Sequence, residues 1–180
     1  MANYKIVFTG PVGAGKTTAI ESLSDIPLVK TDESASDMTQ NRKSSTTVAM
    51  DYGLLNLSKT ERVHLYGTPG QQRFDFMWEI LSEGGLGLVL LIDNSRDNPF
   101  ADLDFYLNAF REFIDKTGVV IGVTQMDRKA TPTLGEYGTY LRERIGNYPV
   151  FEADARKQRD VSILVQALLY NLDPRVHANA

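Results

Sequence analysis

Residues 10–17 read Gly-Pro-Val-Gly-Ala-Gly-Lys-Thr and fit the pattern G-x-x-x-x-G-K-[ST]. This stretch, called the phosphate loop below, follows an apolar run at 4–9 that is typical of a strand. It precedes a run at 16–23 that is typical of a helix. Glycines let the backbone curl so that successive N–H groups point at phosphate oxygens, and the helix N-terminus adds partial positive charge. The pattern therefore predicts a loop that holds the phosphates of a nucleotide.

Two side chains of the phosphate loop carry specific chemistry. The Lys16 ammonium is expected to reach the β- and γ-phosphates, and the Thr17 hydroxyl is expected to ligate Mg²⁺. The neighbouring residues that would complete the nucleotide site are Gly13, Ala14, Gly15 and Thr18. The alternative interpretation is a glycine-rich turn without a ligand.

The rest of the chain alternates strand-like and helix-like segments, which predicts an α/β fold. Strands are expected at 4–9, 47–57, 61–66, 86–92, 119–123 and 149–151. Helices are expected at 16–23, 72–82, from 98 onward, at 133–145 and from about 160. This order favours a mostly parallel six-stranded sheet with helices on both faces, to which the hairpin at 47–66 adds one antiparallel edge strand. Residues 31–46 are polar and predict no stable element.

Composition narrows the class of protein. The 180 residues are 42% hydrophobic and 23% charged with a net charge of −4, which predicts one globular domain over 1–180 and argues against nucleic-acid binding. The chain contains no cysteine, which excludes disulfides, thiolate metal sites and cysteine nucleophiles, and its two histidines exclude a His-rich zinc site. No signal peptide, lipidation motif or long apolar run is present, so we expect a cytoplasmic protein without a direct membrane anchor.

Four further segments resemble Ras-like small GTPases, in the order in which that family carries them. Tyr66–Phe74 (YGTPGQQRF) is similar to D-T-A-G-Q-E-R-F, and Thr47–Gly53 (TVAMDYG) is similar to T-I-G-V-D-F-G. Val123–Asp127 stands where the family carries N-K-x-D, and Glu152–Arg156 where it carries E-T-S-A-K. The G-T-P-G-Q string is closest to the bacterial MglA-like branch, whose genes lie beside those of roadblock-type proteins. The resemblance implies a P-loop NTPase with a Ras-like three-layer fold.

The resemblance also implies a switch that cycles between GTP and GDP with Mg²⁺. In such a site Gly70 presents its N–H to the γ-phosphate, Gln71 orients the attacking water, and Thr47 closes on Mg²⁺ and the γ-phosphate. Together with Lys16, Gly70 and Gln71 form the expected catalytic set. Two segments, about 31–47 and 67–82, would signal to partners, among them a roadblock-type regulatory protein, and hydrolysis would be slow.

The base is expected to be guanine because of Asp127. A carboxylate only accepts hydrogen bonds, and guanine offers it two donors, the ring N1–H and the 2-amino group, whereas adenine offers none there. Thr124 and Gln125 stand in place of the usual Asn and Lys, and Arg156 in place of the usual Lys. The Ala155 N–H can still reach the guanine oxygen because it belongs to the backbone.

Departures from the family pattern leave three points open. Gly67 stands where most relatives carry an aspartate on the Mg²⁺ side, so we expect a metal site that depends on Thr17, Thr47 and water. Asp93 ends a strand and is either a metal-side acid or the opening residue of a loop. An arginine that assists hydrolysis could be Arg42, Arg73 or a residue of a partner.

Two other functions remain compatible with the sequence. The protein could be a nucleotide-gated docking module with negligible intrinsic hydrolysis. It could also be a P-loop ATPase or small-molecule kinase, although the basic stretch at 156–159 is short for the lid of a kinase.

Overall fold

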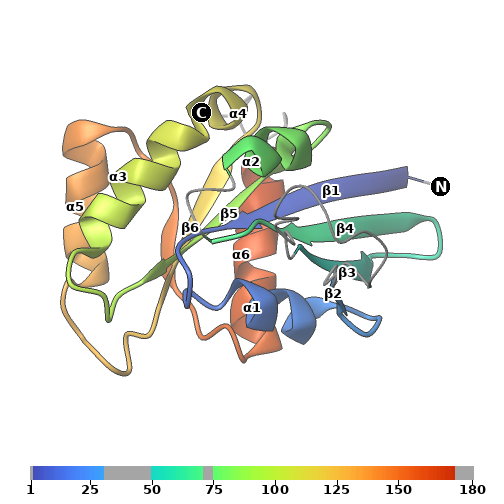
Figure 1. Ribbon diagram of the computed structural model, residues 1–180, viewed down its shortest axis with the longest axis horizontal. Helices are drawn as coiled ribbons and strands as arrows, with labels where there is room; N and C mark the ends of the chain where they lie inside the picture. The colour runs from blue at the N-terminus through green and yellow to red at the C-terminus, as the bar shows by residue number, and fades with distance from the viewer. Residues whose placement is uncertain (1, 31–49, 71–74, 173–180) are drawn as a thin grey trace, which may run out of the picture.

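The computed structural model describes residues 2–30, 50–70 and 75–172, with the backbone alone at 75–77. The described residues form one seven-stranded sheet with helices on both sides (Figure 1). The strands are β1 (Ala2–Thr9), β2 (Val29–Lys30), β3 (Asp51–Asn56), β4 (Glu61–Gly67), β5 (Gly87–Asp93), β6 (Val119–Thr124) and β7 (Val150–Glu152). The helices are α1 (Lys16–Leu23), α2 (Asp75–Ser82), α3 (Pro99–Ala109), α4 (Arg111–Lys116), α5 (Leu134–Arg144) and α6 (Gln158–Asn171). The residues Arg42, Thr47, Gln71 and Arg73 lie outside the described part of the chain.

The sheet confirms the predicted α/β class and corrects its detail. Its order is β2-β3-β4-β1-β5-β6-β7, and β4, β1, β5, β6 and β7 run parallel. β3 pairs antiparallel with β4, but it is not the edge, because β2 pairs antiparallel with β3 beyond it. The expected count of six strands is therefore corrected to seven. A two-residue strand such as β2 carries no periodicity in its sequence, and only its partner β3 defines it.

The sheet is the middle layer of three, because its side chains alternate between two faces. On β1, Ile6 and Phe8 pack toward α1 and α6, whereas Val7 packs toward the opposite face. That opposite face is covered by α2, α3, α4 and α5, whose buried residues include Trp78, Leu103, Ile114 and Tyr137. Strands buried on both faces explain the uninterrupted apolar runs of β5 and β6. Among the described residues no helix is long and apolar enough to cross a bilayer.

The helix expected from Asn98 onward is two helices. α3 ends at Ala109 and α4 begins at Arg111, with Phe110 between them at φ −101° and ψ 12°. Phe110 is buried beneath this break. No Gly or Pro marks the break between α3 and α4, and the residue at the break is a buried phenylalanine. The sequence therefore carries no signal for this interruption.

The parallel strands bring the loops that follow them to one edge of the sheet. The phosphate loop follows β1, residues 68–70 follow β4, residues 94–98 follow β5, residues 125–127 follow β6 and residues 153–156 follow β7. Ligands of open α/β sheets bind at the carboxyl ends of the strands. The candidate site therefore lies at this edge.

Candidate nucleotide-binding site

Three glycines give the phosphate loop its curl. The φ angles of Gly10, Gly13 and Gly15 are 139°, 86° and 95°, and residues other than glycine rarely adopt such values. A Cβ on Gly10 would lie 2.0 Å from the Leu91 carbonyl oxygen, and one on Gly15 would lie 2.8 Å from the Ala155 Cβ. The glycines therefore allow both the loop conformation and its close contact with β5 and with the segment after β7.

Lys16 lies folded over the phosphate loop and is buried. Its Nζ donates to the carbonyl oxygens of Gly10 at 2.7 Å and Pro11 at 2.8 Å. Burial lowers the Lys16 pKa from 10.5 to about 8, and the negative charge of Asp51 opposes this shift. The loop thus concentrates one desolvated cation where phosphates are expected, while Gly13 and Thr18 remain exposed beside it.

A carboxylate that sequence reasoning missed lies beside Thr17. The Thr17 hydroxyl donates to Oδ2 of Asp51, which stands directly opposite Gly67 in the antiparallel β3–β4 ladder. A Cβ on Gly67 would lie 3.1 Å from the Asp51 Cβ and 3.4 Å from Asp51 Oδ2. A carboxylate thus lies beside Thr17 although Gly67 carries none, because it comes from β3 and not from β4.

The side chains around Thr17 fit a magnesium ion. A hydroxyl and a carboxylate are hard oxygen donors, which Mg²⁺ prefers, and Mg²⁺ usually takes one or two carboxylates together with phosphate oxygens and water. Among the described residues no cluster of three or more His, Cys, Asp or Glu side chains forms a metal site by itself. Thr17 and Asp51 could therefore hold the ion only together with the phosphates of a nucleotide.

The backbone of Gly70 lies close against the phosphate loop. A Cβ at Gly70 would lie 2.7 Å from the Val12 nitrogen and 2.8 Å from the Lys16 Nζ. Tyr106 of α3 donates from its hydroxyl to the Gly70 carbonyl at 3.1 Å, and the Trp78 indole N–H donates to the Pro69 carbonyl at 3.2 Å. The segment expected to sense the terminal phosphate is therefore held between the loop and α3.

Thr124 joins the end of β6 to the phosphate loop. It is buried, and its hydroxyl donates to the carbonyl oxygens of Ala14 at 3.0 Å and Ile92 at 3.3 Å. The following Gln125 has a φ of 61°, the one positive value among the described residues other than glycine. A hydroxyl thus contacts the phosphate loop from the position where the Ras-like family carries Asn, and the backbone turns sharply before Asp127.

Asp127 lies exposed at the end of this turn, close to Arg156. The Arg156 Nη2 is 3.7 Å from Asp127 Oδ2, and Arg156 is bound more closely by Asp154, at 2.8 Å from Nε and 2.9 Å from Nη2. The hydrogen bonds from Arg156 hold the pKa of Asp154 well below its usual range. The structure therefore places Arg156 close to Asp127 and adds Asp154 as the residue that orients Arg156.

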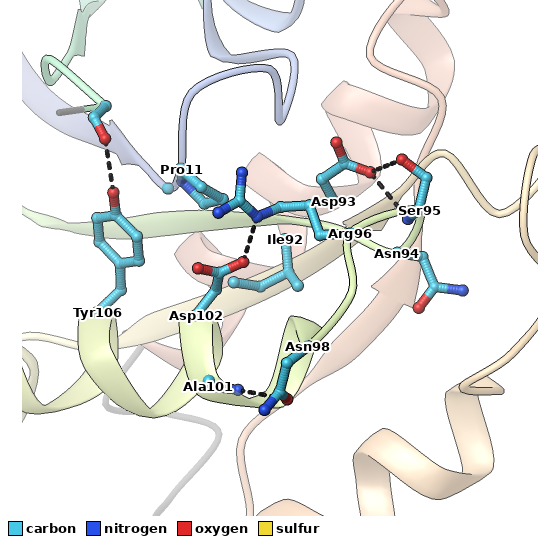
Figure 2. Close-up of polar contacts among 12 residues, drawn as sticks. Pro11, Ile92, Asp93, Asn94, Ser95, Arg96, Asn98, Ala101, Asp102 and Tyr106 are labelled. Atoms are coloured by element: carbon cyan, nitrogen blue, oxygen red, sulfur yellow. Dashed lines mark hydrogen bonds and ion pairs between the residues drawn. The ribbon is translucent and has the colours of Figure 1, made fainter.

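Asp93 is engaged within its own loop. Its Oδ1 accepts hydrogen bonds from the Ser95 N–H at 2.9 Å and the Ser95 hydroxyl at 2.6 Å (Figure 2). These are the contacts of an aspartate that opens a loop. A Cβ on Gly13 would lie 3.9 Å from Asp93 Oδ2, so Asp93 borders the phosphate loop at Gly13.

Comparison with known proteins agrees with a nucleotide site. A family described as "Conserved hypothetical ATP binding protein" matches residues 27–137, a range that includes Asp51, Gly70 and Asp127 and begins after the phosphate loop. The uncharacterized protein MJ1339 of Methanocaldococcus jannaschii is 34% identical over 92 residues, which cover 51% of this chain and 52% of that protein. The Ras-related protein Rab-44 of Mus musculus is 26% identical over 150 residues, which cover 79% of this chain and 14% of that protein.

The chain therefore spans about half of one relative and a small part of the other. The family match covers more than half of the chain, and the weaker similarity to Rab-44 extends over most of it. Together with the α/β sheet, they identify a nucleotide-binding protein of the P-loop GTPase-like type. The chain belongs to the P-loop NTPase-like family described as conserved hypothetical ATP-binding proteins.

Proposed function

We propose that the protein is a Ras-like small GTPase of the MglA-like branch, a single domain that binds GTP and GDP with Mg²⁺ and hydrolyses GTP slowly. The observation that carries the proposal is that Gly70 lies against the phosphate loop of Lys16 and Thr17, and that Thr124 links this loop to the segment of Asp127. Gln71 would orient the attacking water, and Thr47 would join Thr17 and Asp51 at the metal.

The signalling part of the proposal rests on the resemblance in sequence. The segments 31–47 and 67–82 would change with the nucleotide, and a roadblock-type protein in the cytoplasm would recognise them. The position of Gly70 against the phosphate loop supports the second segment, because a terminal phosphate bound there would meet the Gly70 N–H. If hydrolysis proves negligible without a partner, the same site serves as a nucleotide-gated docking module.

The identity of the bound base distinguishes this proposal from ATP binding, which is the function named in the description of the family. Denaturing the freshly purified protein and identifying the released nucleotide by chromatography tests it. Guanine nucleotides would support a GTPase. Adenine nucleotides, or a preference for ATP over GTP in competition, would contradict the role given to Asp127.

Replacing Asp127 by Asn is expected to shift the preference from guanine toward xanthine by roughly a hundredfold. Asp127 is exposed here, and a bound base would cover it. A covered polar group rejects a base that leaves it unpaired, and Asn offers a donor where Asp offers only acceptors. Displacement of a bound fluorescent nucleotide by GDP and by XDP, compared between the original protein and the variant, measures the shift. The exposed Asp115 of α4 provides the control Asp115→Asn, and equal selectivity of both variants would remove Asp127 from base recognition.

Nucleotide affinity is expected to fall as pH rises above about 8, by up to about tenfold per pH unit. In the protein without nucleotide, Lys16 has a pKa of about 8 and therefore loses its proton above this pH. Because the phosphates bind the ammonium form, nucleotide binding above pH 8 must take up a proton. Stability moves oppositely: burial penalises the charged Lys16 of the folded protein below pH 8, and this penalty is relieved as pH rises toward 10.5. A loss of affinity above pH 8 therefore does not reflect unfolding through Lys16.

Titrations of a fluorescent GDP derivative from pH 7 to 9 measure this dependence, and calorimetry in two buffers of different ionisation enthalpy counts the protons taken up. The variant Lys16→Arg is the control, because its guanidinium stays protonated throughout this range. A flat profile in the original protein, or the same slope in the variant, would refute the assignment.

A further inference from the structure

Arg96 lies in the loop between β5 and α3, and this loop is firmly anchored. The buried Asn94 donates to the carbonyl oxygens of Lys129 at 2.7 Å and Pro132 at 3.1 Å, and accepts from the Tyr137 hydroxyl at 2.8 Å. Lys129 Nζ donates to the Arg96 carbonyl at 2.8 Å. The backbone of Arg96 is therefore fixed at the edge of the sheet that carries the phosphate loop.

The side chain of Arg96 is held by one atom. Its Nε lies 2.5 Å from Oδ2 of Asp102, in the first turn of α3, and the two side chains are 44% and 17% exposed. An ion pair through Nε leaves the terminal nitrogens of the guanidinium directed elsewhere. In Figure 2 these nitrogens point away from Asp102, on the side where Pro11 of the phosphate loop is drawn.

The contacts of α3 place this arginine near the phosphate loop. Tyr106 follows Asp102 by one helical turn on the same face and donates to the carbonyl of Gly70, whose backbone presses on Val12 and Lys16. Burial raises the pKa of Tyr106 to about 12; the charge of Asp102 adds to the shift and that of Arg96 opposes it. The guanidinium is thus within electrostatic reach of the hydroxyl that holds Gly70.

We infer that Arg96 contacts the terminal phosphate of a bound nucleoside triphosphate and that Asp102 is the positioning residue that orients it. This inference rests on the proposed function and adds to it a binding residue within the described chain. A guanidinium forms charge-assisted hydrogen bonds to phosphate oxygens, and an arginine supplied from the same chain stabilises the charge that develops on the transferred phosphoryl group. Lys16 and Arg96 would then approach the phosphates from two sides.

A contact to the terminal phosphate distinguishes triphosphate from diphosphate, and this ratio is the test. We expect Arg96→Ala to weaken binding of the fluorescent β,γ-imido analogue of GTP roughly tenfold to hundredfold while affinity for fluorescent GDP changes less than twofold. Arg96→Lys should keep part of the difference, because an ammonium lacks the second donor atom and the planar geometry. Asp102→Asn should weaken the triphosphate analogue less than Arg96→Ala does. The matched control is Arg111→Ala, an exposed arginine that begins α4.

The outcomes separate this inference from the proposed function. An unchanged ratio in Arg96→Ala, or an equal loss for both nucleotides, would overturn the role of Arg96 even though nucleotide binding itself persists. A gain of triphosphate affinity in Asp102→Asn would overturn the orienting role of Asp102. Failure of the original protein to bind either guanine nucleotide would refute the proposed function instead, and the corresponding adenine pair, titrated in parallel, makes the test of Arg96 independent of the base.

Discussion

Replacing Lys16 by alanine is expected to lower the affinity for GDP by roughly 10²–10⁴-fold. The Lys16 Nζ already lies within hydrogen-bond distance of two carbonyls of the phosphate loop, so its ammonium is in position for the phosphates that would lie in the loop. Each charge-assisted hydrogen bond contributes about 1.5–3 kcal/mol, and the lysine would make at least two of them. Fluorescence titration with a GDP derivative measures the loss.

The matched control for Lys16 is Lys5 in β1. Its Nζ donates to the Glu83 carbonyl at 2.8 Å, and its pKa is lowered by partial burial, but it lies away from the phosphate loop. Lys5→Ala should bind GDP like the original protein. Thermal unfolding of both variants shows whether each is folded, and a folded Lys16→Ala protein that titrates GDP normally would end the assignment of the phosphate loop.

Replacing Asp51 by alanine is expected to raise, by roughly tenfold to hundredfold, the Mg²⁺ concentration needed to slow the release of GDP. Residues that hold or orient metal ligands typically change metal affinity by this factor. Asp51 accepts the hydrogen bond of Thr17 and stands opposite Gly67, where its carboxylate supplies the charge that β4 lacks. Magnesium titrations of the rate at which GDP is released, with EDTA as the metal-free reference, measure the effect.

A double variant gives this prediction a rescue. In Asp51→Gly with Gly67→Asp, the carboxylate moves across the ladder from β3 to β4. A Cβ at position 67 would lie 3.1 Å from the Asp51 Cβ, and the change to glycine at 51 removes this close contact. The remaining close contact is with Ile20 Cδ1 at 2.9 Å, which is the end of a flexible side chain. Partial recovery of the response to Mg²⁺ would support a metal role for the carboxylate. A Mg²⁺ response in Asp51→Ala equal to that of the original protein would exclude it.

A second readout of Asp51 is independent of the metal. Its charge opposes the lowering of the Lys16 pKa, so its removal should shift the decline of affinity to a lower pH. Magnesium titration and pH titration thus test two consequences of one carboxylate. A variant that changes neither would show that Asp51 serves only the β3–β4 ladder.

Local pattern was sufficient for much of the fold and for the phosphate side of the site. The strand at 4–9 and the helix at 16–23 follow from apolar spacing around the octapeptide, and β5 and β6 follow from their continuous apolar runs. The break at Phe110 was not predictable in this way. Nor was β2, since two residues that pair only with β3 have no period of their own.

Sequence alone determined the octapeptide that forms the curled loop after β1, the alternation that builds a parallel sheet, and the position of an aspartate at 127. Those features depend on residue types at short spacing, which the order of letters specifies directly. Only the tertiary structure decided that Asp51 of β3 lies beside Thr17 and opposite Gly67, that Thr124 contacts Ala14, and that Arg96 pairs with Asp102, one helical turn before the tyrosine that donates to Gly70. These contacts join residues far apart in the chain, and strand register and helix packing, which no local pattern encodes, bring them together.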